Sequence, residues 1–313
     1  MNKYIISKVN ALAGRIMDGR PIGQKIREGV KGEVECLDDS GVRPLLATIL
    51  VGDNPASQVY VRNKHSACRA AGIASRNIQL NSNTSQSELL GVIGDLNRDP
   101  NVTGILLQLP LPKGLDDASA ITEIAPEKDV DGLHPFNLGQ LWRKSAPLAP
   151  CTPKGVVVLL KCYGVEIAGR HVVIVNRTKL VGRPLAQLLL NEDATVTICH
   201  SKTQNLRDLG READILVTAI GHRQQFTVGS EMVKPGAAVV DVGTSTVNGK
   251  LAGDVEFESV LKTASFLTPV PGGVGPMTIA LLLYNTLIAA AMQRNAQIRF
   301  NPEQLTGLMI NAS

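Results

Sequence analysis

Tyr60 and Lys64 form the first pair of side chains in the sequence that could move protons. They are four residues apart, in Tyr-Val-Arg-Asn-Lys, so in a helix they would lie on one face, one turn apart. A lysine desolvated beside polar neighbours has a lowered pKa and can act as an acid or base near neutral pH. A solvated lysine above a half-buried tyrosine has the same spacing, so the spacing alone leaves both interpretations open.

Gln108 is a polar residue within an apolar run, Gly104-Ile-Leu-Leu-Gln-Leu-Pro110. A buried amide costs free energy unless it is hydrogen-bonded. The carboxyl end of a strand, where Gln108 is expected, is where open α/β sheets bind ligands. The sequence is equally consistent with a ligand-binding glutamine and with a structural one.

An acid-rich loop contains Asp129, Asp131, Gly132 and His134. Two carboxylates and one histidine could bind a metal ion, but no further ligands cluster nearby, so we expect no metal site. A carboxylate could instead accept hydrogen bonds from the N–H groups of a heterocycle. A solvated turn is the remaining interpretation.

The turn from Asn176 to Pro184 follows an expected strand and precedes an expected helix. It lacks G-x-G-x-x-G, yet its backbone N–H groups and the helix N-terminus could bind phosphate, with Arg177 and Arg183 as cationic partners. After the next strand, the acid that NAD-binding domains use for the ribose is missing, and Ser201 stands there between His200 and Lys202. Hydroxyl groups and cations accept a 2′-phosphate that an acid would repel, so the pattern favours NADP over NAD.

The run Thr268-Pro-Val-Pro-Gly-Gly-Val-Gly-Pro-Met277 is rich in special residues and includes Pro271, Gly272 and Gly273. Glycines let the backbone approach a flat ligand closely, and Pro271 could follow a cis peptide bond. We favour a ligand-binding loop over a tight interdomain turn.

The composition indicates which scaffold holds these residues. The chain has 313 residues, which is about two domains at roughly 150 residues each. Hydrophobic residues make up 44% and aromatic residues 3%, so the core must consist of Val, Ile, Leu and Ala, as is typical of parallel sheets covered by helices. This composition excludes a disordered chain.

Strands and helices alternate in both halves of the pattern, which implies parallel pairing. The first half predicts strands at 44–51, 78–80 and 104–109, with helices at 22–39, 56–72 and from 85. The second half predicts strands at 171–175, 195–199, 214–219, 237–242 and 265–268, with helices at 155–163, 184–191 and 277–294. The second half is therefore expected to be a doubly wound nucleotide-binding domain.

A Pro-rich crossing at residues 143–155 marks the expected domain boundary. We expect an α/β protein of two domains. An N-terminal α/β domain at 1–149 is joined by the returning C-terminal helix and tail at 277–313, and a doubly wound domain occupies 150–276.

Charge and cysteine usage exclude several classes of partner. The formal net charge of +4 is spread out, without a Lys/Arg-rich block, so no nucleic-acid partner is expected. The longest apolar stretch, 279–292, is too short for a membrane span, so no membrane partner is expected. The five cysteines lack metal-ligand or redox spacing, which predicts free thiols in a reducing compartment. The basic N-terminus could be a transit peptide, but we favour a short folded or frayed extension.

Several segments resemble, in order, the bifunctional methylenetetrahydrofolate dehydrogenase/methenyltetrahydrofolate cyclohydrolase family of one-carbon metabolism. The resemblance covers residues 16–293. The matching segments are 51–64 (VGDNPASQVYVRNK), 104–112 (GILLQLPLP), 126–132 (PEKDVDG), 150–155 (PCTPKG), 199–203 (CHSKT), 240–243 (VDVG) and 268–278 (TPVPGGVGPMT).

The resemblance implies that the first domain and the last helix bind folate and that the second, Rossmann-like domain binds NADP. It implies catalytic roles for Lys64, Tyr60 and Gln108 and a pterin-binding role for Asp131. Further implied contacts are Pro271, Gly272 and Gly273 for the substrate, and Asn176, Arg177, Thr178, Ser201, Gly243 and Thr244 for the cofactor.

The enzyme implied by the resemblance oxidises 5,10-methylenetetrahydrofolate with NADP and hydrolyses the methenyl product to 10-formyltetrahydrofolate. The resemblance also implies a cytoplasmic homodimer that serves purine, methionine and histidine biosynthesis. No metal is required, and a neutral Lys64 would shuttle the proton in the hydrolytic step.

Two positions depart from the family pattern. The usual Gly-Arg-Ser is Asn176-Arg177-Thr178 here, and the lysine after Ile-Gly is His222. Asn176 could reshape the phosphate turn and push Arg177 aside. Two other classes remain open: a monofunctional NAD(P)-dependent dehydrogenase for this or another small substrate, and a non-catalytic folate-binding protein. Neither needs the full set of candidate catalytic residues.

Overall fold

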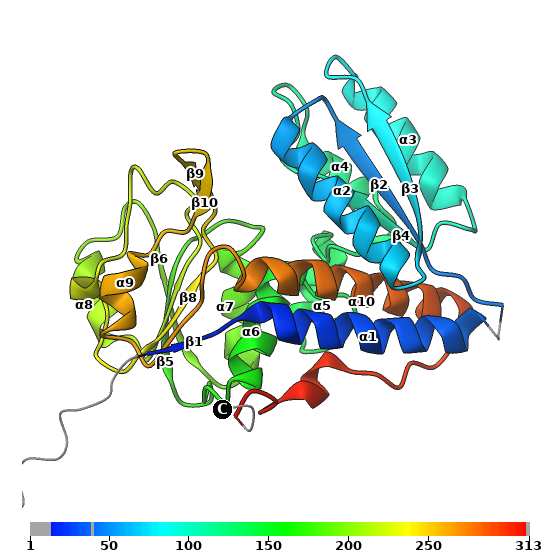
Figure 1. Cartoon of the computed structure of the whole chain (residues 1–313). Coiled ribbons are helices and arrows are strands. Elements are labelled where there is room, and N and C mark those ends of the chain that lie inside the picture. The colour runs from blue at the N-terminus through cyan, green and yellow to red at the C-terminus, as the bar shows by residue number, and fades with distance from the viewer. Residues whose placement is uncertain (1–13, 39–40, 311–313) are drawn as a thin grey trace, which may run out of the picture. The chain divides into compact units, whose positions relative to one another are not determined.

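The computed structural model describes residues 14–38 and 41–310 (Figure 1). They form two compact units, and each unit is built from two separate stretches of chain. The Rossmann-like unit comprises residues 14–19 and 163–275, and the second, here called the lysine unit after Lys64, comprises residues 20–162 and 276–310. The N-terminal extension discussed above lies in residues 1–13, outside the described residues.

A six-stranded sheet forms the centre of the Rossmann-like unit, in the order β1-β11-β8-β7-β5-β6. All its strand pairs are parallel, as the alternating pattern predicted. The strands are β1 (Arg15–Ile16), β5 (His171–Val175), β6 (Thr195–Cys199), β7 (Ile215–Thr218), β8 (Ala238–Asp241) and β11 (Phe266–Leu267). The order turns back at β5, which pairs with β6 on one side and β7 on the other.

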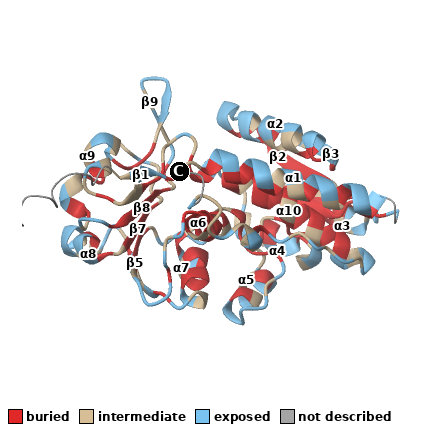
Figure 2. Ribbon diagram, turned by 60° about the horizontal axis from the view of Figure 1, so that its bottom comes forward, coloured by how far each residue is buried: buried red, intermediate tan, exposed pale blue. Residues whose placement is uncertain are grey.

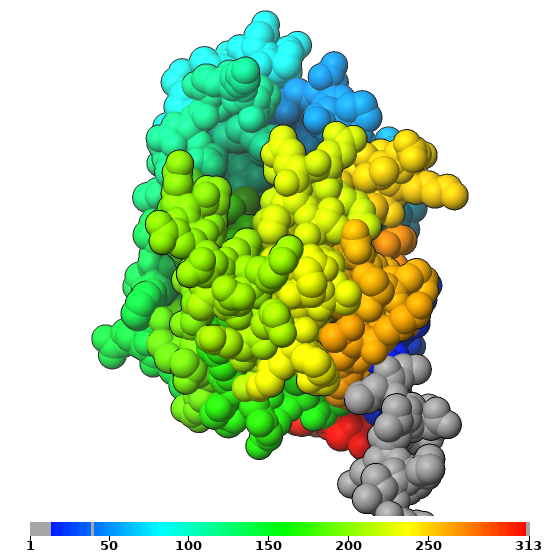
Figure 3. Space-filling view, turned by 90° about the vertical axis from the view of Figure 1, so that its left-hand side faces the viewer, coloured from blue at the N-terminus to red at the C-terminus, as the bar shows by residue number. Residues whose placement is uncertain are grey.

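Short elements complete the Rossmann-like unit. Its helices are α7 (Gly182–Asn191), α8 (Leu206–Glu212), α9 (Phe257–Leu261) and the 3₁₀ turn η2 (Ser230–Met232). A hairpin of β9 (Ser245–Val247) and β10 (Lys250–Ala252) projects from the unit and is visible in Figures 1 and 3. The sequence pattern predicted α7 but neither α8, α9 nor the hairpin.

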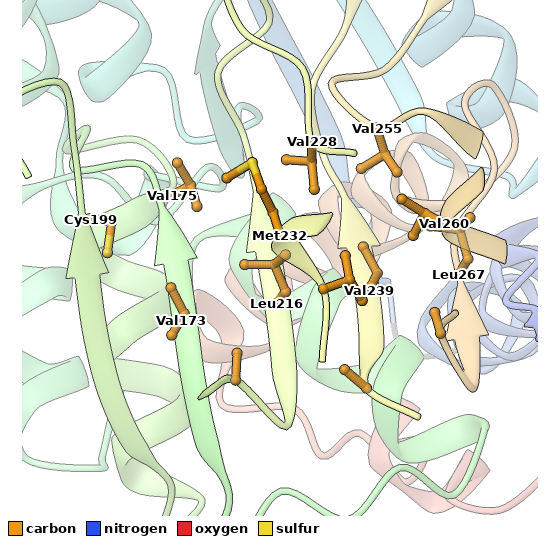
Figure 4. Close-up of a cluster of buried hydrophobic side chains, with 14 residues drawn as sticks. Val173, Val175, Cys199, Leu216, Val228, Met232, Val239, Val255, Val260 and Leu267 are labelled. Carbon is orange, nitrogen blue, oxygen red and sulfur yellow. The ribbon is translucent and has the colours of Figure 1, made fainter. Parts of the chain in front are cut away.

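Aliphatic side chains make the core of this unit, as the scarcity of aromatic residues predicted. Val173, Leu216 and Val239 from three neighbouring strands are fully buried in one cluster (Figure 4). Burying one such side chain contributes about 1.5–3 kcal/mol. The central strands β5, β7 and β8 are buried along most of their length, whereas β1 and β6 at the two edges of the sheet are more exposed (Figure 2).

The lysine unit has a smaller parallel sheet in the order β3-β2-β4, made of β2 (Leu45–Val51), β3 (Ala74–Leu80) and β4 (Gly104–Leu107). Its helices are α1 (Gly19–Asp38), α2 (Pro55–Ala70), α3 (Gln86–Arg98), α4 (Asp117–Glu123), α5 (Pro135–Trp142), α6 (Cys151–Cys162) and α10 (Val274–Arg294). Two 3₁₀ turns, η1 (Pro126–Lys128) and η3 (Pro302–Leu305), complete it.

Helix ends in the lysine unit are fixed by side chains. The Ser85 hydroxyl accepts a hydrogen bond from Glu88 N, and the Glu88 carboxylate accepts one from Ser85 N, which confirms the predicted capping box. At the other end of α3, Lys128 Nζ donates to three main-chain carbonyls, those of Leu96, Asn97 and Asp99, at 3.1, 2.8 and 2.9 Å. A cation at a helix C-terminus also complements the helix dipole.

α6 begins at Cys151, inside the crossing that was expected to be irregular, because a proline such as Pro153 is tolerated in the first turn of a helix. The helix packs with the lysine unit rather than with the Rossmann-like unit. The chain therefore passes between the units at residues 162–163, whereas the sequence pattern placed the boundary at 149–150.

α10 is 21 residues long, longer than the apolar stretch considered above and, by length and composition alone, sufficient to cross a membrane. However, 67% of its most apolar window is buried inside the structure. Burial, rather than insufficient length, therefore marks α10 as a helix of the protein core. As predicted, it packs with the first half of the chain: Asn285 hydrogen-bonds the carbonyls of Val130 and Ala149.

Residues 295–310, here called the C-terminal strap, lie along the lysine unit. The backbone N–H groups of Arg299 and Phe300 donate to Glu33 Oε1 of α1, at 3.1 and 2.8 Å. The Phe300 ring packs edge-to-face on Tyr284 of α10 and lies over Gly29 of α1, where a Cβ would come within 2.5 Å of the ring. The glycine therefore permits the close approach.

Glu303 fastens the strap to α6 through ion pairs with Lys154 and Lys161. Burial opposes ionisation of this carboxyl, but the two ammonium groups hold its pKa below the ordinary value. Further along, Gly307 N and Met309 N donate to the carbonyls of Lys161 and Cys162 at the end of α6.

Candidate active site

α2 carries Lys64, and its start is fixed by a cap. The chain leaves β2 through Gly52, which has a φ of +82°. The Asn54 side chain then accepts a hydrogen bond from Ser57 N at 3.0 Å, and Pro55 opens the helix. Lys64 Nζ, in the third turn, donates to Gln108 Oε1 at 2.9 Å.

Gln108 follows β4 and continues its pairing with β2, because its N–H donates to Ile49 O at 2.9 Å. Its side-chain Nε2 donates to Leu109 O at 2.8 Å, so the amide oxygen is the atom directed at Lys64. The structure therefore brings together the two residues that the sequence offered separately as candidates.

Asp131 supplies the charge that faces Lys64. Burial lowers the pKa of Lys64, and the Asp131 carboxylate opposes this shift without cancelling it. Burial likewise raises the pKa of Asp131, and the Lys64 ammonium opposes that shift. Both groups are thus biased toward their neutral forms.

Cys151 is a site residue that the sequence reasoning missed. Its thiol is buried and donates a hydrogen bond to Val130 O, next to Asp131 in the chain, at 3.3 Å. Burial raises the pKa of the thiol well above its ordinary value, so it remains a neutral donor. Cys68 of α2 is also buried near Lys64, with a pKa raised by burial to about 12. All five cysteines are free, as predicted. The signal for Cys151 was its place within Pro150-Cys-Thr-Pro-Lys-Gly, not its spacing from other cysteines.

The acid-rich loop divides into a structural half and a site half. Asp129 is 2% exposed and accepts hydrogen bonds at Oδ2 from His134 N and Asn137 Nδ2, at 2.7 and 2.9 Å. His134 in turn caps α5, accepting from Phe136 N. Only Asp131 faces Lys64. Within the described residues, no three His, Cys, Asp or Glu side chains gather in a way that could hold a metal ion.

Tyr60 lies one turn before Lys64 on α2, and 45% of it is exposed. The tyrosine is thus about half exposed, one helical turn from Lys64.

The turn after β5 is held from inside by Asn176. Its Oδ1 accepts hydrogen bonds from Thr178 N, Thr178 Oγ1 and Gly182 N, at 2.8, 2.8 and 3.0 Å. Its Nδ2 donates to Ala219 O after β7. The asparagine side chain thus occupies the inside of the turn, and Arg177 stays exposed on the outside. The concern that Asn176 would displace Arg177 is not supported by this geometry.

Sheet register brings Arg177 and Ser201 to the same edge. Val175 at the end of β5 is paired with Cys199 at the end of β6. Arg177 follows the first of these residues and Ser201 the second, and both are exposed. The residues that follow β6 are His200, Ser201 and Lys202, so no acid occupies this edge of the sheet beside Arg177.

A buried carboxylate holds the end of strand β8. Asp241, at the end of β8, accepts from Gly243 N and Asp254 N at Oδ1 and from Val255 N at Oδ2. Burial raises the pKa of Asp241 to about 6. This network fixes Gly243, and Thr244 follows it in an exposed position.

The glycine-rich loop before α10 belongs to the Rossmann-like unit. The peptide bond before Pro271 is cis, as the sequence suggested. Gly272 has a φ of +120°, and its carbonyl accepts from Gly19 N at 2.9 Å. A Cβ on Gly273 would come within 2.7 Å of the Thr268 side chain. These two positions therefore need glycine for the fold itself.

Comparison with known proteins agrees with this geometry. The sequence model described as tetrahydrofolate dehydrogenase/cyclohydrolase, catalytic domain, matches residues 17–131, and the model for the NAD(P)-binding domain of the same family matches residues 150–294. The C-terminal strap lies beyond both matches.

Individual relatives match most of the chain. A bifunctional protein FolD of Nitrosopumilus maritimus is 50% identical over 281 residues, which cover 90% of this chain and 98% of the relative.

Solved structures agree as well. A bifunctional FolD methylenetetrahydrofolate dehydrogenase/cyclohydrolase of Campylobacter jejuni superposes with a TM-score of 0.85 at 47% identity, covering 88% of this chain and 98% of that one. A Trypanosoma brucei methylenetetrahydrofolate dehydrogenase-cyclohydrolase, solved with NADP cofactor and inhibitor, gives 0.86 at 41% identity, covering 90% and 99%. The chain therefore belongs to the tetrahydrofolate dehydrogenase/cyclohydrolase family.

Proposed function

We propose that this protein oxidises 5,10-methylenetetrahydrofolate to the 5,10-methenyl cation with NADP and hydrolyses that cation to 10-formyltetrahydrofolate. The observation that carries the proposal is the hydrogen bond from Lys64 Nζ to Gln108 Oε1 at 2.9 Å, on a lysine whose pKa is lowered by burial. Family membership supplies the identity of the substrate, and the lysine supplies a means of moving a proton at neutral pH.

Lys64 is the proton-transfer group of the hydrolytic step. In its neutral form it donates one hydrogen to Gln108 and keeps a lone pair that can take a proton from the attacking water. The cationic substrate depresses the pKa of the lysine further through like-charge repulsion. Gln108 orients the amine, because its own amide is fixed by Leu109 O.

Asp131 and Tyr60 bind the pterin. A carboxylate can accept hydrogen bonds from the ring N–H groups, and the exposed Tyr60 ring offers an apolar surface with a polar tip beside it. We assign Pro271, Gly272 and Gly273 to substrate contact as well, because these residues match the family's substrate-binding loop.

The Rossmann-like unit has residues that fit NADP. A Cβ on Gly182 would overlap Asn176 O, so the backbone at the start of the turn packs directly against the backbone at the start of α7. Arg177, Thr178 and Ser201 are exposed at the paired ends of β5 and β6 and would hold phosphate, the 2′-phosphate included. Asn176 would keep this turn in shape, and Gly243 and Thr244 would contact the cofactor from β8. When bound, NADP supplies a hydride acceptor.

The test is a spectrophotometric assay of methenyl formation and decay with NADP and with NAD. The proposal predicts formation with NADP followed by hydrolysis, and loss of hydrolysis in Lys64→Met. Formation without any decay would indicate the monofunctional dehydrogenase instead. Asp131→Ala should weaken folate binding while leaving NADP binding unchanged, because it removes an acceptor worth about 1–3 kcal/mol. Equal losses for both ligands would indicate a structural role for Asp131.

We further propose a cytoplasmic homodimer that supplies one-carbon units to purine, methionine and histidine biosynthesis and has no nucleic-acid or membrane partner. A dimer is compatible with β6, the outermost strand of its sheet, where Ile198 is 38% exposed and neighbouring Leu190 of α7 is 52% exposed. Sedimentation of the native chain and of Ile198→Lys tests this assignment: only the native chain should sediment as a dimer.

A further inference from the structure

Asn285 is a buried amide in the middle of α10, a mainly apolar helix, and it is 3% exposed. Burying an amide costs free energy unless its donors find acceptors. Its Nδ2 group has two acceptors, the carbonyl oxygens of Val130 and Ala149, each at 2.9 Å. One side chain thus joins two loops that are separate in sequence.

These two loops carry the residues that face Lys64. Val130 O belongs to the peptide group that leads into Asp131, so a bond to this oxygen fixes the plane from which the Asp131 side chain starts. Ala149 stands two residues before Cys151, the first residue of α6. The Cys151 thiol donates to Val130 O at 3.3 Å, and its sulfur accepts from Asn285 Nδ2 at 3.4 Å.

The two loops also pack directly against each other, backbone against backbone. Gly132 has a φ of +70°, and a Cβ there would come within 2.6 Å of the backbone carbon of Ala149. Neither loop is a regular strand or helix at this point, and the amide of Asn285 ties both to the same helix, α10.

We propose that Asn285 is a positioning residue for Asp131: it holds the carboxylate in the place from which it binds the substrate ring. The inference rests on the function proposed above and adds to it a residue that touches neither substrate nor cofactor. Small displacements of a binding group are costly, because even a 1 Å misplacement can reduce a rate by about a hundredfold.

The test is a double-mutant cycle between Asn285→Leu and Asp131→Ala, read as KM for 5,10-methenyltetrahydrofolate in the cyclohydrolase assay. Leucine has a similar volume and removes both N–H donors. We expect Asn285→Leu to raise KM by about tenfold in the native background and by less than about twofold in the Asp131→Ala background, because residues that act as a unit are not additive. kcat should fall less than KM rises, since Lys64 and Gln108 keep their places.

Thr286→Val is the matched control. Thr286 is also fully buried on α10, but its hydroxyl donates only within the helix, to Leu282 O at 2.8 Å. This variant should change thermal stability and leave KM within about twofold of the native value. If Asn285→Leu is unfolded at the assay temperature, Asn285→Ser, which keeps one donor, replaces it in the same cycle with a smaller expected rise in KM.

Equal KM increases in both backgrounds would overturn the inference and reduce Asn285 to a stabilising residue, as would an unchanged KM in Asn285→Leu. Failure of the proposed function looks different: the native chain itself would then neither hydrolyse nor bind 5,10-methenyltetrahydrofolate.

Discussion

Lys64 Nζ donates a hydrogen bond to Gln108 Oε1 at 2.9 Å. This bond connects α2 to the end of β4, the strand that pairs with β2. The lysine is thereby held by a neutral acceptor rather than by a carboxylate. A neutral acceptor orients the amine without stabilising its charged form, which is the condition for a lysine that must lose its proton near neutral pH.

Lys64→Arg tests whether the lysine must release a proton. Arginine keeps the positive charge and the donors but does not deprotonate at ordinary pH. We expect the cyclohydrolase rate to fall by about 10²–10⁴-fold and the dehydrogenase rate to fall less, because hydride transfer has no obligatory general base. Arg62→Lys, an exposed change on the same helix, is the control and should leave both rates unchanged. A fully active Lys64→Arg would remove Lys64 from the proton transfer.

Gln108→Glu should move the pH dependence of hydrolysis. A carboxylate beside Lys64 stabilises the ammonium form and raises the pKa of the lysine, so a higher pH is needed to obtain the neutral amine. The acid limb of the cyclohydrolase pH profile should therefore shift to higher pH, with activity recovered in alkaline buffer. A rate lowered equally at all pH values would mean that Gln108 only orients the amine.

Asp129→Asn should raise or preserve stability at pH 8. Burial raises the pKa of Asp129 from 3.8 to about 6, so the folded chain binds this proton more tightly than the unfolded chain. The native free energy of unfolding should consequently fall as pH rises from about 4 to about 6, by up to about 2–3 kcal/mol for this group. Asparagine can keep both hydrogen bonds, because both go to Oδ2. Thermal unfolding between pH 4 and pH 8 should show a smaller pH dependence in the variant.

Asp241→Asn should lower stability, in contrast to Asp129→Asn. The pKa of Asp241 is also raised to about 6, but both of its oxygens accept backbone N–H groups. An amide NH₂ in place of either oxygen would face a donor, so we expect lower stability at every pH, by about 1–3 kcal/mol. Equal behaviour of the two variants would contradict the hydrogen-bond assignment.

Arg177→Ala should reduce the preference for NADP over NAD. A guanidinium on the 2′-phosphate contributes charge-assisted hydrogen bonds of about 1.5–3 kcal/mol, equivalent to tenfold or more in kcat/KM. The measurement is kcat/KM with each cofactor for the native chain and the variant, with Arg211→Ala as an exposed control in the same unit. Equal use of NAD and NADP by the native chain would refute the assignment.

Gly29→Ala and Gly32→Ala should have opposite effects on stability. Both residues lie in α1, where alanine is favoured over glycine by about 1 kcal/mol. A Cβ at Gly32 has no heavy atom within 4 Å, whereas a Cβ at Gly29 would enter the Phe300 ring of the strap. Thermal unfolding should therefore rise for Gly32→Ala and fall for Gly29→Ala. A rise for both would mean that the strap does not lie on α1 in solution.

The sequence predicted long-range architecture best where buried aliphatic runs were bounded by turn residues. β5 and β6 lie at the predicted residues, because each is a short run of β-branched residues with clear breaks on either side. α4, α5, α8 and α9 were missed, since helices of five to eight residues contain too few turns for a periodic pattern. β1 was missed because two residues become a strand only by pairing with β11, far along the chain.

Site residues were predictable where type and local position sufficed. Lys64, Gln108 and Asp131 could be identified as candidates, yet their burial and mutual contact depend on three separate elements. Asn285 carries no local signal of function, and the only signal for Cys151 was its place in the segment 150–155, because the contacts of both residues with the Asp131 loop exist only in the folded chain. For Asn176 the sequence left open whether its side chain reshapes the turn, and in the structure this side chain accepts the N–H groups that close the turn.

The division of both units into separate stretches of chain sets an order for their completion during synthesis. The Rossmann-like unit has all its residues once residue 275 has emerged from the ribosome. The lysine unit, although most of it is made first, still lacks α10 and the strap at that moment. The apolar surface of the lysine unit therefore stays exposed while the Rossmann-like unit can already fold. We expect the Rossmann-like unit to fold first and the incomplete lysine unit to be the part of the nascent chain that is prone to aggregation.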